Sequence, residues 1–489
     1  MANKKTKIAL VIEQGFGARV LLQTNILKNL LLDEFDICVL TSGYQSIRDY
    51  LDKSGLSSIP VYLMNTDKYH KRNQKLLVRL CKFTRLYCLN TQTMKDSFDL
   101  QIKDSKISGN RNHKIFIKLV QVLVTVCRLH IKLAKLLIIC ENKLATVKSN
   151  TEFFINHEPD ILITTSLGNF DHDDYILREA KCNKIKTITY ILGWDNTSTR
   201  GHGIGLSDQI ITWSEVMRNE LIDIHGLNPS QIEIGGVSHY DAYDAKADNL
   251  WSKKTLYNAL NIPQDKELII FGTKSPSSYL SNQSIVRSIC HWIATDTKLQ
   301  NHILVCRLHP IYFRDNRNKS GSHFGEDWNK LVEEIGSDKL IIDYPEILDG
   351  DLNYFMPANE IYKLGSLLKH SKLSINMFST LNLEASIFDI PSINVAFQDK
   401  NPEILGFKQS RYNIKVDHNK THTQRLINTN ATSVTSDYDE LLSSIKEELS
   451  NPDDKSIYRK QLVQQECHTN IGDGGQLVSE IIRSFCSTL

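Results

Sequence analysis

The chain has 489 residues, which is too long for a single hydrophobic core and predicts two domains. Its content of 41% hydrophobic and 23% charged residues is typical of globular proteins and excludes wholesale disorder. A net charge of +2 argues against a protein that binds nucleic acid over its whole surface. The 10 cysteines form no CxxC pair, so we expect reduced thiols and a cytoplasmic protein instead of a disulfide framework or a zinc site.

The chain opens with a strand, a helix and a second strand. An apolar run at 8–12 ends in a glycine-containing turn, and a helical pattern at 19–32 leads to another apolar run at 37–41. No small-residue cleavage site follows the first run, so we expect a β-strand and not a signal peptide. Because ligands favour the carboxyl ends of parallel strands, Glu13 and Gly17 in this turn are candidate substrate contacts. The turn lacks GxGxxG and therefore carries no dinucleotide fingerprint.

A basic segment follows at 67–148, where eighteen Lys and Arg residues face only five Asp and Glu, a net charge of +13. Inside it, polar residues recur at alternating steps of four and three, which predicts one polar stripe on a long helix with its other faces buried. These residues are Lys114, Lys118, Gln121, Thr125, Arg128, Lys132 and Lys135. Charges recur too often for a membrane span. A hairpin packed on its own domain, an oligomer contact and a surface for anionic lipid all remain open, whereas the lack of interleaved aromatic residues disfavours nucleic acid.

Strands and helices alternate again after this segment, and four strand ends are expected at one sheet edge. The turn after the apolar run 187–192 contains Trp194, Asp195 and Asn196. An aromatic ring beside a strand end suits stacking on a sugar, so Trp194 and Asn196 join Gly17 as candidate acceptor contacts. As the general base for an acceptor hydroxyl we rank Asp195 first, ahead of Glu13 and His172. The first domain is expected to cover 1–245, with a helical insertion at about 67–150.

The α/β rhythm restarts in the second half, where we expect a domain at 246–457 and a closing helix at 458–489 that returns to the first domain. Polar residues at the ends of its strands suit a diphosphate, because cations and helix N–H groups stabilise a departing nucleotide without a metal. A carboxylate one helical turn further on suits hydrogen bonds from ribose hydroxyls. The candidates are Lys274, Arg307, His309, Ser379, Thr380 and Glu384.

Two acidic clusters, 171–174 and 349–351, imitate the DxD motif that holds a metal ion in another class of transferase. The first precedes a helix, where acidic residues are favoured by the helix dipole, and the second lies in a glycine-containing loop. The histidines show no HExxH spacing. We therefore expect no metal site and no cofactor.

Longer motifs carry a resemblance. ILVCRLHP and the later SLLKHSKLSINMFSTLNLEASIFDIPSINV resemble the second domain of CDP-glycerol glycerophosphotransferase-like and surface-polysaccharide transferases, which have an R-x-HP motif. GWDNTSTRG, TWSE and IEIGGVSHYDAYD are similar to the end of the first domain of the same group. The resemblance covers roughly 160–397, and departs from the group at Met377 and Phe378, where an acidic residue is common. It implies a GT-B fold with two Rossmann-like domains facing a cleft. It also implies a ribose contact at Glu384 and phosphate contacts at Arg307, His309, Ser379 and Thr380.

We therefore expect a metal-independent glycosyltransferase that moves a sugar from a nucleotide-activated donor to a surface polysaccharide or a lipid-linked glycan. The basic segment would hold it at the inner face of the cell membrane. The alternatives are a CDP-polyol phosphotransferase of the teichoic-acid type, a sugar-nucleotide epimerase, and a non-catalytic protein that binds a glycan or nucleotide. Nucleic acid is not an expected partner, and the oligomeric state stays open.

Overall fold

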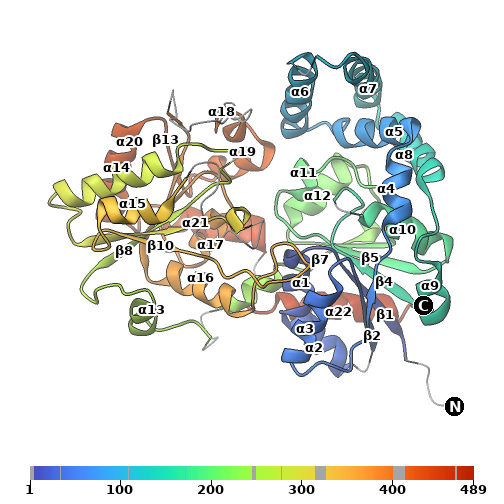
Figure 1. The fold of residues 1–489 in the computed structure, drawn as a ribbon, viewed down its shortest axis with the longest axis horizontal. Coiled ribbons are helices and arrows are strands. Elements are labelled where there is room, and N and C mark those ends of the chain that lie inside the picture. Colours follow the sequence, from blue (N-terminus) through green and yellow to red (C-terminus); the bar gives the residue numbers. More distant parts are fainter. Residues whose placement is uncertain are drawn as a thin grey trace. The chain divides into compact units, whose positions relative to one another are not determined.

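The computed structural model divides into two α/β units (Figure 1). It describes residues 5–33, 35–107, 109–170, 172–244, 249–276, 278–313, 326–399, 414–468 and 471–489. The first unit comprises 1–239, 350–355 and 473–489, and the second comprises 240–349 and 356–472. The chain thus changes units at 239/240, where the sequence analysis placed the boundary at 245/246, and residues 458–472 belong to the second unit.

The first unit is built on a seven-stranded sheet in the order β3-β2-β1-β4-β5-β6-β7, with every pair of neighbours parallel. Its strands are β1 Lys7–Ile12, β2 Asp36–Thr41, β3 Val61–Leu63, β4 Ile161–Thr164, β5 Lys186–Tyr190, β6 Gln209–Thr212 and β7 Ile232–Ile234. The central strands are buried on both faces, which is why they appear in the sequence as continuous apolar runs. The strand order reverses between β1 and β4, and α/β sheets bind ligands at such a switch point.

Helices cover the faces of this sheet (Figure 1). They are α1 Gly15–Leu22, α2 Asn25–Leu32, α3 Tyr44–Lys53, α10 Asp173–Cys182, α11 Asn196–Thr199, α12 Glu215–Asp223 and α22 Gly474–Cys486. The single helix predicted at 19–32 is wrong, because Thr24 accepts a hydrogen bond from the Ile26 amide (3.3 Å) and so starts a second helix. The last helix, α22, packs on α2, where Arg483 pairs with Asp33 at 2.7 Å.

The basic insertion and the segment after it are helical, and the helices α5 to α8 form a small core of their own. The helices are α4 Asp67–Asn73, α5 Leu76–Tyr87, α6 Gln92–Ile107, α7 Arg111–Leu129, α8 Ile131–Ala145 and α9 Thr151–His157. Phe116, Val120 and Val124 of α7 pack against Phe98 of α6 in this core. The single long helix predicted here is wrong, because the chain becomes extended at His130 (φ −152°, ψ 122°).

A buried ion cluster fastens the insertion to the first sheet's helical layer. The Glu141 carboxylate of α8 accepts from Arg85 of α5 and from Arg178 of α10, both at 2.7 Å. Arg178 also pairs with Asp174 at 3.0 Å. Burial by itself would raise the pKa of Asp174, but Lys82 and Arg178 bring it below its ordinary value. The inner face of this segment is therefore packed on α10 of the first unit.

The second unit holds a six-stranded sheet in the order β10-β9-β8-β11-β12-β13, again parallel throughout. Its strands are β8 Glu267–Gly272, β9 His302–Arg307, β10 Leu340–Asp343, β11 Ser371–Asn376, β12 Ser392–Val395 and β13 Ser433–Thr435. Its α-helices are α13 Lys253–Ala259, α14 Asn282–Thr295, α15 Trp328–Ile335, α16 Asn359–Lys369, α17 Leu381–Ile387, α18 Ile414–His418, α19 Thr421–Asn428, α20 Tyr438–Ser450 and α21 Ser456–Cys467. Here the strand order reverses between β8 and β11.

Residues 350–355 belong to the first unit and pack at the start of α1 and α3. The Gly15 amide donates to the Asn353 carbonyl at 2.8 Å. The Asp351 carboxylate accepts from the Ser46 and Gln45 amides at 2.9 and 3.1 Å. Asp351 thus satisfies the exposed N–H groups of α3, which explains one of the two acidic clusters without a metal.

This packing predicts opposite effects for two substitutions in the same helix. A Cβ atom at Gly15 would overlap the backbone of Tyr354 and Phe355. Gly15→Ala should therefore lower the free energy of unfolding by about 1–3 kcal/mol. At Gly17 a Cβ would make an ordinary contact, 3.5 Å from the Thr165 hydroxyl, so Gly17→Ala should be neutral or stabilise the helix by about 0.5–1 kcal/mol. Urea titrations of both variants test this, and equal stability of the two would contradict it.

Candidate functional site

The switch point of the second sheet is occupied by Lys274, two residues beyond the end of β8. Its ammonium group donates to the Met377 carbonyl at 3.2 Å and pairs with Asp417 of α18 at 2.5 Å. Met377 directly follows β11, so Lys274 joins the carboxyl ends of the two strands between which the order reverses. The structure therefore brings Lys274 together with the turn that leads to Ser379 and Thr380.

Lys274 and Lys420, both partly exposed, flank the buried carboxylate of Asp417. Burial lowers the pKa of Lys274, and Asp417 opposes this shift. Burial would likewise raise the pKa of Asp417, but Lys274 and Lys420 together lower it. The sequence gives no signal for Asp417 and Lys420, because they occur in a short polar stretch without a motif. They show that Lys274 is a positioned cation and not a solvated surface charge.

His309 lies near this cation at the end of β9. Its amide donates to the Thr273 hydroxyl at 2.8 Å, and its ring Nδ1 accepts from the Ile311 amide at 3.1 Å. The residue is exposed overall, yet partial desolvation of the ring and then the charge of Lys274 lower its pKa. A neutral ring with Nδ1 as acceptor presents Nε2–H as a donor, which is the role that a phosphate oxygen requires.

Arg307 was expected to contact a phosphate group, but in the structure its side chain pairs with carboxylates of the protein. Its guanidinium donates to Asp343 of β10 and to Glu360 of α16, the latter at 2.7 Å. Lys363 pairs with the same Asp343 at 2.5 Å. Burial would lower the pKa of Arg307, but the two carboxylates raise it above its ordinary value. In this structure the guanidinium therefore balances internal carboxylates.

The turn between β11 and α17 is strained and held by a buried amide network. Phe378 has φ 54°, a left-handed conformation that is rare for a bulky side chain. Asn394 accepts from the Phe378 amide at 2.9 Å, and Asn376 accepts from the Ser379 amide at 3.0 Å. Asn382 donates to both asparagines at 3.0 Å. Because strained backbone held by its surroundings is concentrated at functional sites, this turn is a candidate binding element.

Ser379 and Thr380 differ in their roles at the head of α17. The Ser379 hydroxyl accepts from the Leu381 amide at 3.2 Å, whereas the Thr380 side chain makes no capping bond and is exposed. Glu384, one turn further, is 8% exposed and accepts from the Tyr243 hydroxyl at 2.7 Å. Its ribose contact stays a prediction.

The switch point of the first sheet carries a carboxylate–imidazole pair. Glu13 follows β1, and its Oε2 lies 2.6 Å from Nδ1 of His172, while its Oε1 accepts from the His172 amide at 2.9 Å. The Glu13 side chain is 5% exposed and that of His172 is 25% exposed. Since a carboxylate only accepts, Nδ1 carries the proton of a neutral ring, and Nε2 is the nitrogen that takes up another. This is the arrangement of an oriented general base.

The other candidates in the first unit are less well placed. Asp195 accepts from the Thr199 hydroxyl at 3.0 Å and precedes α11, whose first residue is Asn196. Trp194 is 2% exposed, so the ring expected to stack on a sugar is buried. Gly17 is buried inside α1. The geometry thus favours the Glu13–His172 pair over Asp195, which the sequence had ranked first.

The other acidic cluster, 171–174, lies at the start of helix α10. Asp173 and Asp174 begin α10 and are buried, and Asp171 lies outside the described residues. Within the described ranges, no group of three or more His, Cys, Asp or Glu side chains is arranged to hold a metal ion.

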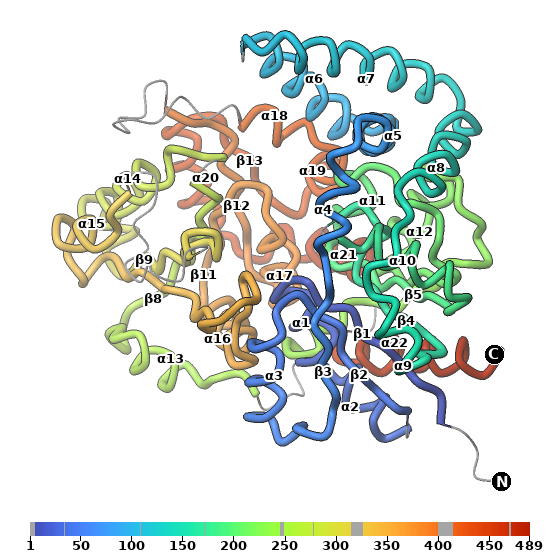
Figure 2. Tube along the Cα trace, turned by 45° about the vertical axis from the view of Figure 1, so that its right-hand side comes forward, coloured from blue at the N-terminus to red at the C-terminus, as the bar shows by residue number. Residues whose placement is uncertain are grey.

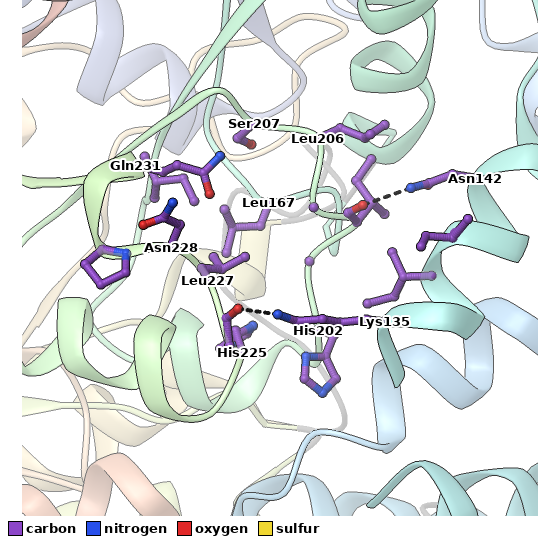
Figure 3. Close-up of a pocket in the computed structure, with 18 residues that line it drawn as sticks. Lys135, Asn142, Leu167, His202, Leu206, Ser207, His225, Leu227, Asn228 and Gln231 are labelled. Atoms are coloured by element: carbon purple, nitrogen blue, oxygen red, sulfur yellow. Dashed lines mark hydrogen bonds between the residues drawn. The ribbon is translucent and has the colours of Figure 1, made fainter. Parts of the chain in front are cut away.

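A cavity of about 580 Å³ lies elsewhere in the first unit, between α8 and the segments 202–207 and 225–231. Figure 3 shows its two sides bridged by Lys135, which donates to the Gly226 carbonyl at 2.6 Å, and by Asn142, which donates to the Ile204 carbonyl at 2.9 Å. Burial lowers the pKa of His202 to about 2 and that of His225 to about 4, so both rings are neutral. None of the predicted site residues lines this cavity.

No protein-family model matches the chain, and no curated protein matches it. Several solved structures have a similar fold. The structure of MnaA from S. aureus with UDP has 11% identity and a TM-score of 0.53, over 99% of this chain and 98% of that one. UDP-GlcNAc 2-epimerase from Neisseria meningitidis, bound to UDP-GlcNAc, has 13% identity and a TM-score of 0.52, over 98% and 100%. A putative UDP-N-acetylglucosamine 2-epimerase from Listeria monocytogenes has 12% identity and a TM-score of 0.53, over 99% and 98%. The predicted fold class, two parallel-sheet α/β domains as in GT-B proteins, is confirmed.

Proposed function

We propose that this protein is a cytoplasmic enzyme that acts on a nucleotide-activated sugar and transfers the sugar to a hydroxyl of a glycan or lipid-linked acceptor. The observation that carries the proposal is the hydrogen-bonded pair of Glu13 and His172 at the switch point of the first sheet. Transfer to a hydroxyl needs a base, and an imidazole oriented by a carboxylate is suited to this task near neutral pH.

The second sheet would bind the nucleotide at its own switch point. Lys274 supplies a fixed positive charge, and His309 supplies a ring N–H donor near it. The strained turn at 378–380 adds exposed polar groups. Solved structures of similar fold hold UDP and UDP-GlcNAc, which supports a uridine nucleotide as the donor.

The proposed reaction assigns one role to each of these groups. The acceptor hydroxyl loses its proton to Nε2 of His172 while its oxygen bonds to the anomeric carbon. The bond between that carbon and the diphosphate oxygen breaks, and its electron pair leaves with the nucleoside diphosphate. Lys274 stabilises the charge that accumulates there. Neither a metal ion nor a cofactor takes part in this scheme.

A sugar-nucleotide epimerase is the second candidate, and one observation favours it. Two of the similar solved structures, which align with nearly the whole chain, are described as UDP-GlcNAc 2-epimerases. An epimerase would convert the nucleotide sugar without any acceptor. A CDP-polyol phosphotransferase, which the sequence motifs resemble, would instead release CMP and leave a phosphodiester in its product.

Incubation with UDP-GlcNAc in D₂O, followed by NMR, separates these reactions. With no acceptor present, a transferase leaves the sugar unchanged, whereas an epimerase produces the C2 epimer with deuterium at C2. Addition of glycan acceptors should then release UDP together with a new glycosidic bond. Conversion of UDP-GlcNAc without an acceptor would show that the protein is an epimerase and not a transferase. A phosphodiester product from a CDP-polyol would exclude both.

Nucleotide binding is predicted to raise the melting temperature of the protein. A ligand present at about 100 times its Kd stabilises the native state by about 2.7 kcal/mol. We expect UDP to produce this shift in a thermal-shift panel, and Lys274→Met to weaken UDP binding at least about 10-fold by removing one charge-assisted contact. Lys372→Met, at a lysine whose side chain is 56% exposed, is the control. Flat responses to UDP, GDP, CDP and TDP would contradict a nucleotide site.

A further inference from the structure

We propose that the outer face of α7 and α8 is a docking surface for an anionic lipid bilayer. Large apolar side chains recur along both helices at alternating steps of four and three residues, with 40% to 79% of each exposed. They are Ile115, Leu119, Val122, Val126, Leu129, Leu133 and Leu136. We call this set the apolar stripe. The sequence analysis expected these positions to be buried, and that expectation is wrong.

The stripe is opposite the side of α7 that packs in the core of the insertion. Phe116, Val120 and Val124 are buried there, so the same helix is apolar on two faces, and among the described residues only one of these faces is buried. Figure 2 shows α8 following α7 after a turn of the chain. The chain is extended at His130, so α7 and α8 each carry their own part of the stripe.

The charges around the stripe define its partner. Residues 111–145, all of which the structure describes, contain seven Lys and Arg and a single acidic residue, Glu141. Glu141 is buried between Arg85 and Arg178, so it does not offset the exposed charge. Lys118, Lys132 and Lys143 are exposed beside the stripe. Within 111–145, therefore, the exposed formal charges are all positive.

This combination fits a lipid surface better than a second copy of the chain. A twofold contact through this face would place the same basic residues against each other, which is repulsive. No described helix combines the length and the apolarity that crossing a bilayer requires. Helices with an apolar face and basic borders lie in the plane of the bilayer, with their apolar side chains at the acyl boundary and their lysines among anionic headgroups.

The experiment is flotation of the full chain with vesicles, without donor or acceptor, so its outcome is independent of the proposed reaction. One set of vesicles contains equal parts of phosphatidylglycerol and phosphatidylethanolamine, and the other contains phosphatidylcholine alone. We expect binding to the anionic set that weakens as salt rises. Two triple variants separate the contributions: V122Q/L129Q/L136Q removes apolar groups, and K118Q/K132Q/K143Q removes charge.

Each triple variant should lower the vesicle partition coefficient on the order of 100-fold, since each lysine near an anionic surface contributes about one factor of five and each buried apolar group contributes at least as much. The control is L32Q/L63Q/I457Q, which changes three apolar residues that are 62% to 72% exposed outside the stripe. It should bind as the parent does, and circular dichroism confirms that all variants are folded. Equal binding of the stripe variant and the control would overturn the proposal. So would an oligomer that dissociates on V122Q/L129Q/L136Q while vesicle binding persists.

Discussion

Replacing His172 with glutamine should lower kcat by about 10² to 10⁴-fold, because a general base contributes that much to proton transfer. Glutamine retains a polar side chain but cannot take up a proton near neutral pH. Initial rates of UDP release at saturating acceptor measure the effect, and the melting temperature shows whether the fold is intact. His291→Gln, at an exposed histidine of the second unit, is the matched control.

Glu13 acts through His172 as a positioning residue, and its variant gives a different signature. Glu13→Gln keeps an acceptor for Nδ1–H but removes the negative charge that stabilises the protonated ring. We therefore expect the acidic limb of kcat against pH, which reports deprotonation of the imidazole, to move to lower pH. Unchanged kcat in His172→Gln would eliminate this pair as the base, and Asp195→Asn would then test the first-ranked residue of the sequence analysis.

The second large effect is a loss of stability. Glu141→Ala should lower the free energy of unfolding by about 3–5 kcal/mol, because it leaves the guanidinium groups of Arg85 and Arg178 buried without their shared carboxylate. The exposed fractions of these two arginine side chains are 0% and 1%, so water cannot replace the lost partner. Urea titration with a probe in the first unit measures the change.

Glu215→Ala is the control, since it breaks an exposed pair with Arg218 at 3.0 Å and should cost no more than about 1 kcal/mol. Glu141→Gln, which keeps one acceptor oxygen but loses the charge and the second acceptor, should fall between the two. A loss below about 1 kcal/mol for Glu141→Ala would show that the insertion is held by its apolar core alone.

The strands were predictable because of how a parallel sheet is buried. Both faces of β1, β4 and β8 are covered, so each appears in the sequence as a short continuous apolar run that ends in polar or glycine residues. The strand ends mark the carboxyl edge of each sheet, and for that reason Lys274 and Glu13 could be chosen as candidates from the sequence. The break between α7 and α8 at His130 could not be predicted, because the polar residues keep their helical spacing through it.

The sequence alone determined the fold class, the two parallel sheets and the sheet edge at which the candidate residues lie, because these depend on local patterns of apolar residues and turns. Only the tertiary structure decided which side chains meet there. Glu13 and His172 are 159 positions apart, and Arg307 finds Asp343 and Glu360 on other elements. Such partnerships depend on the distances between side chains after folding, and no spacing along the chain records them.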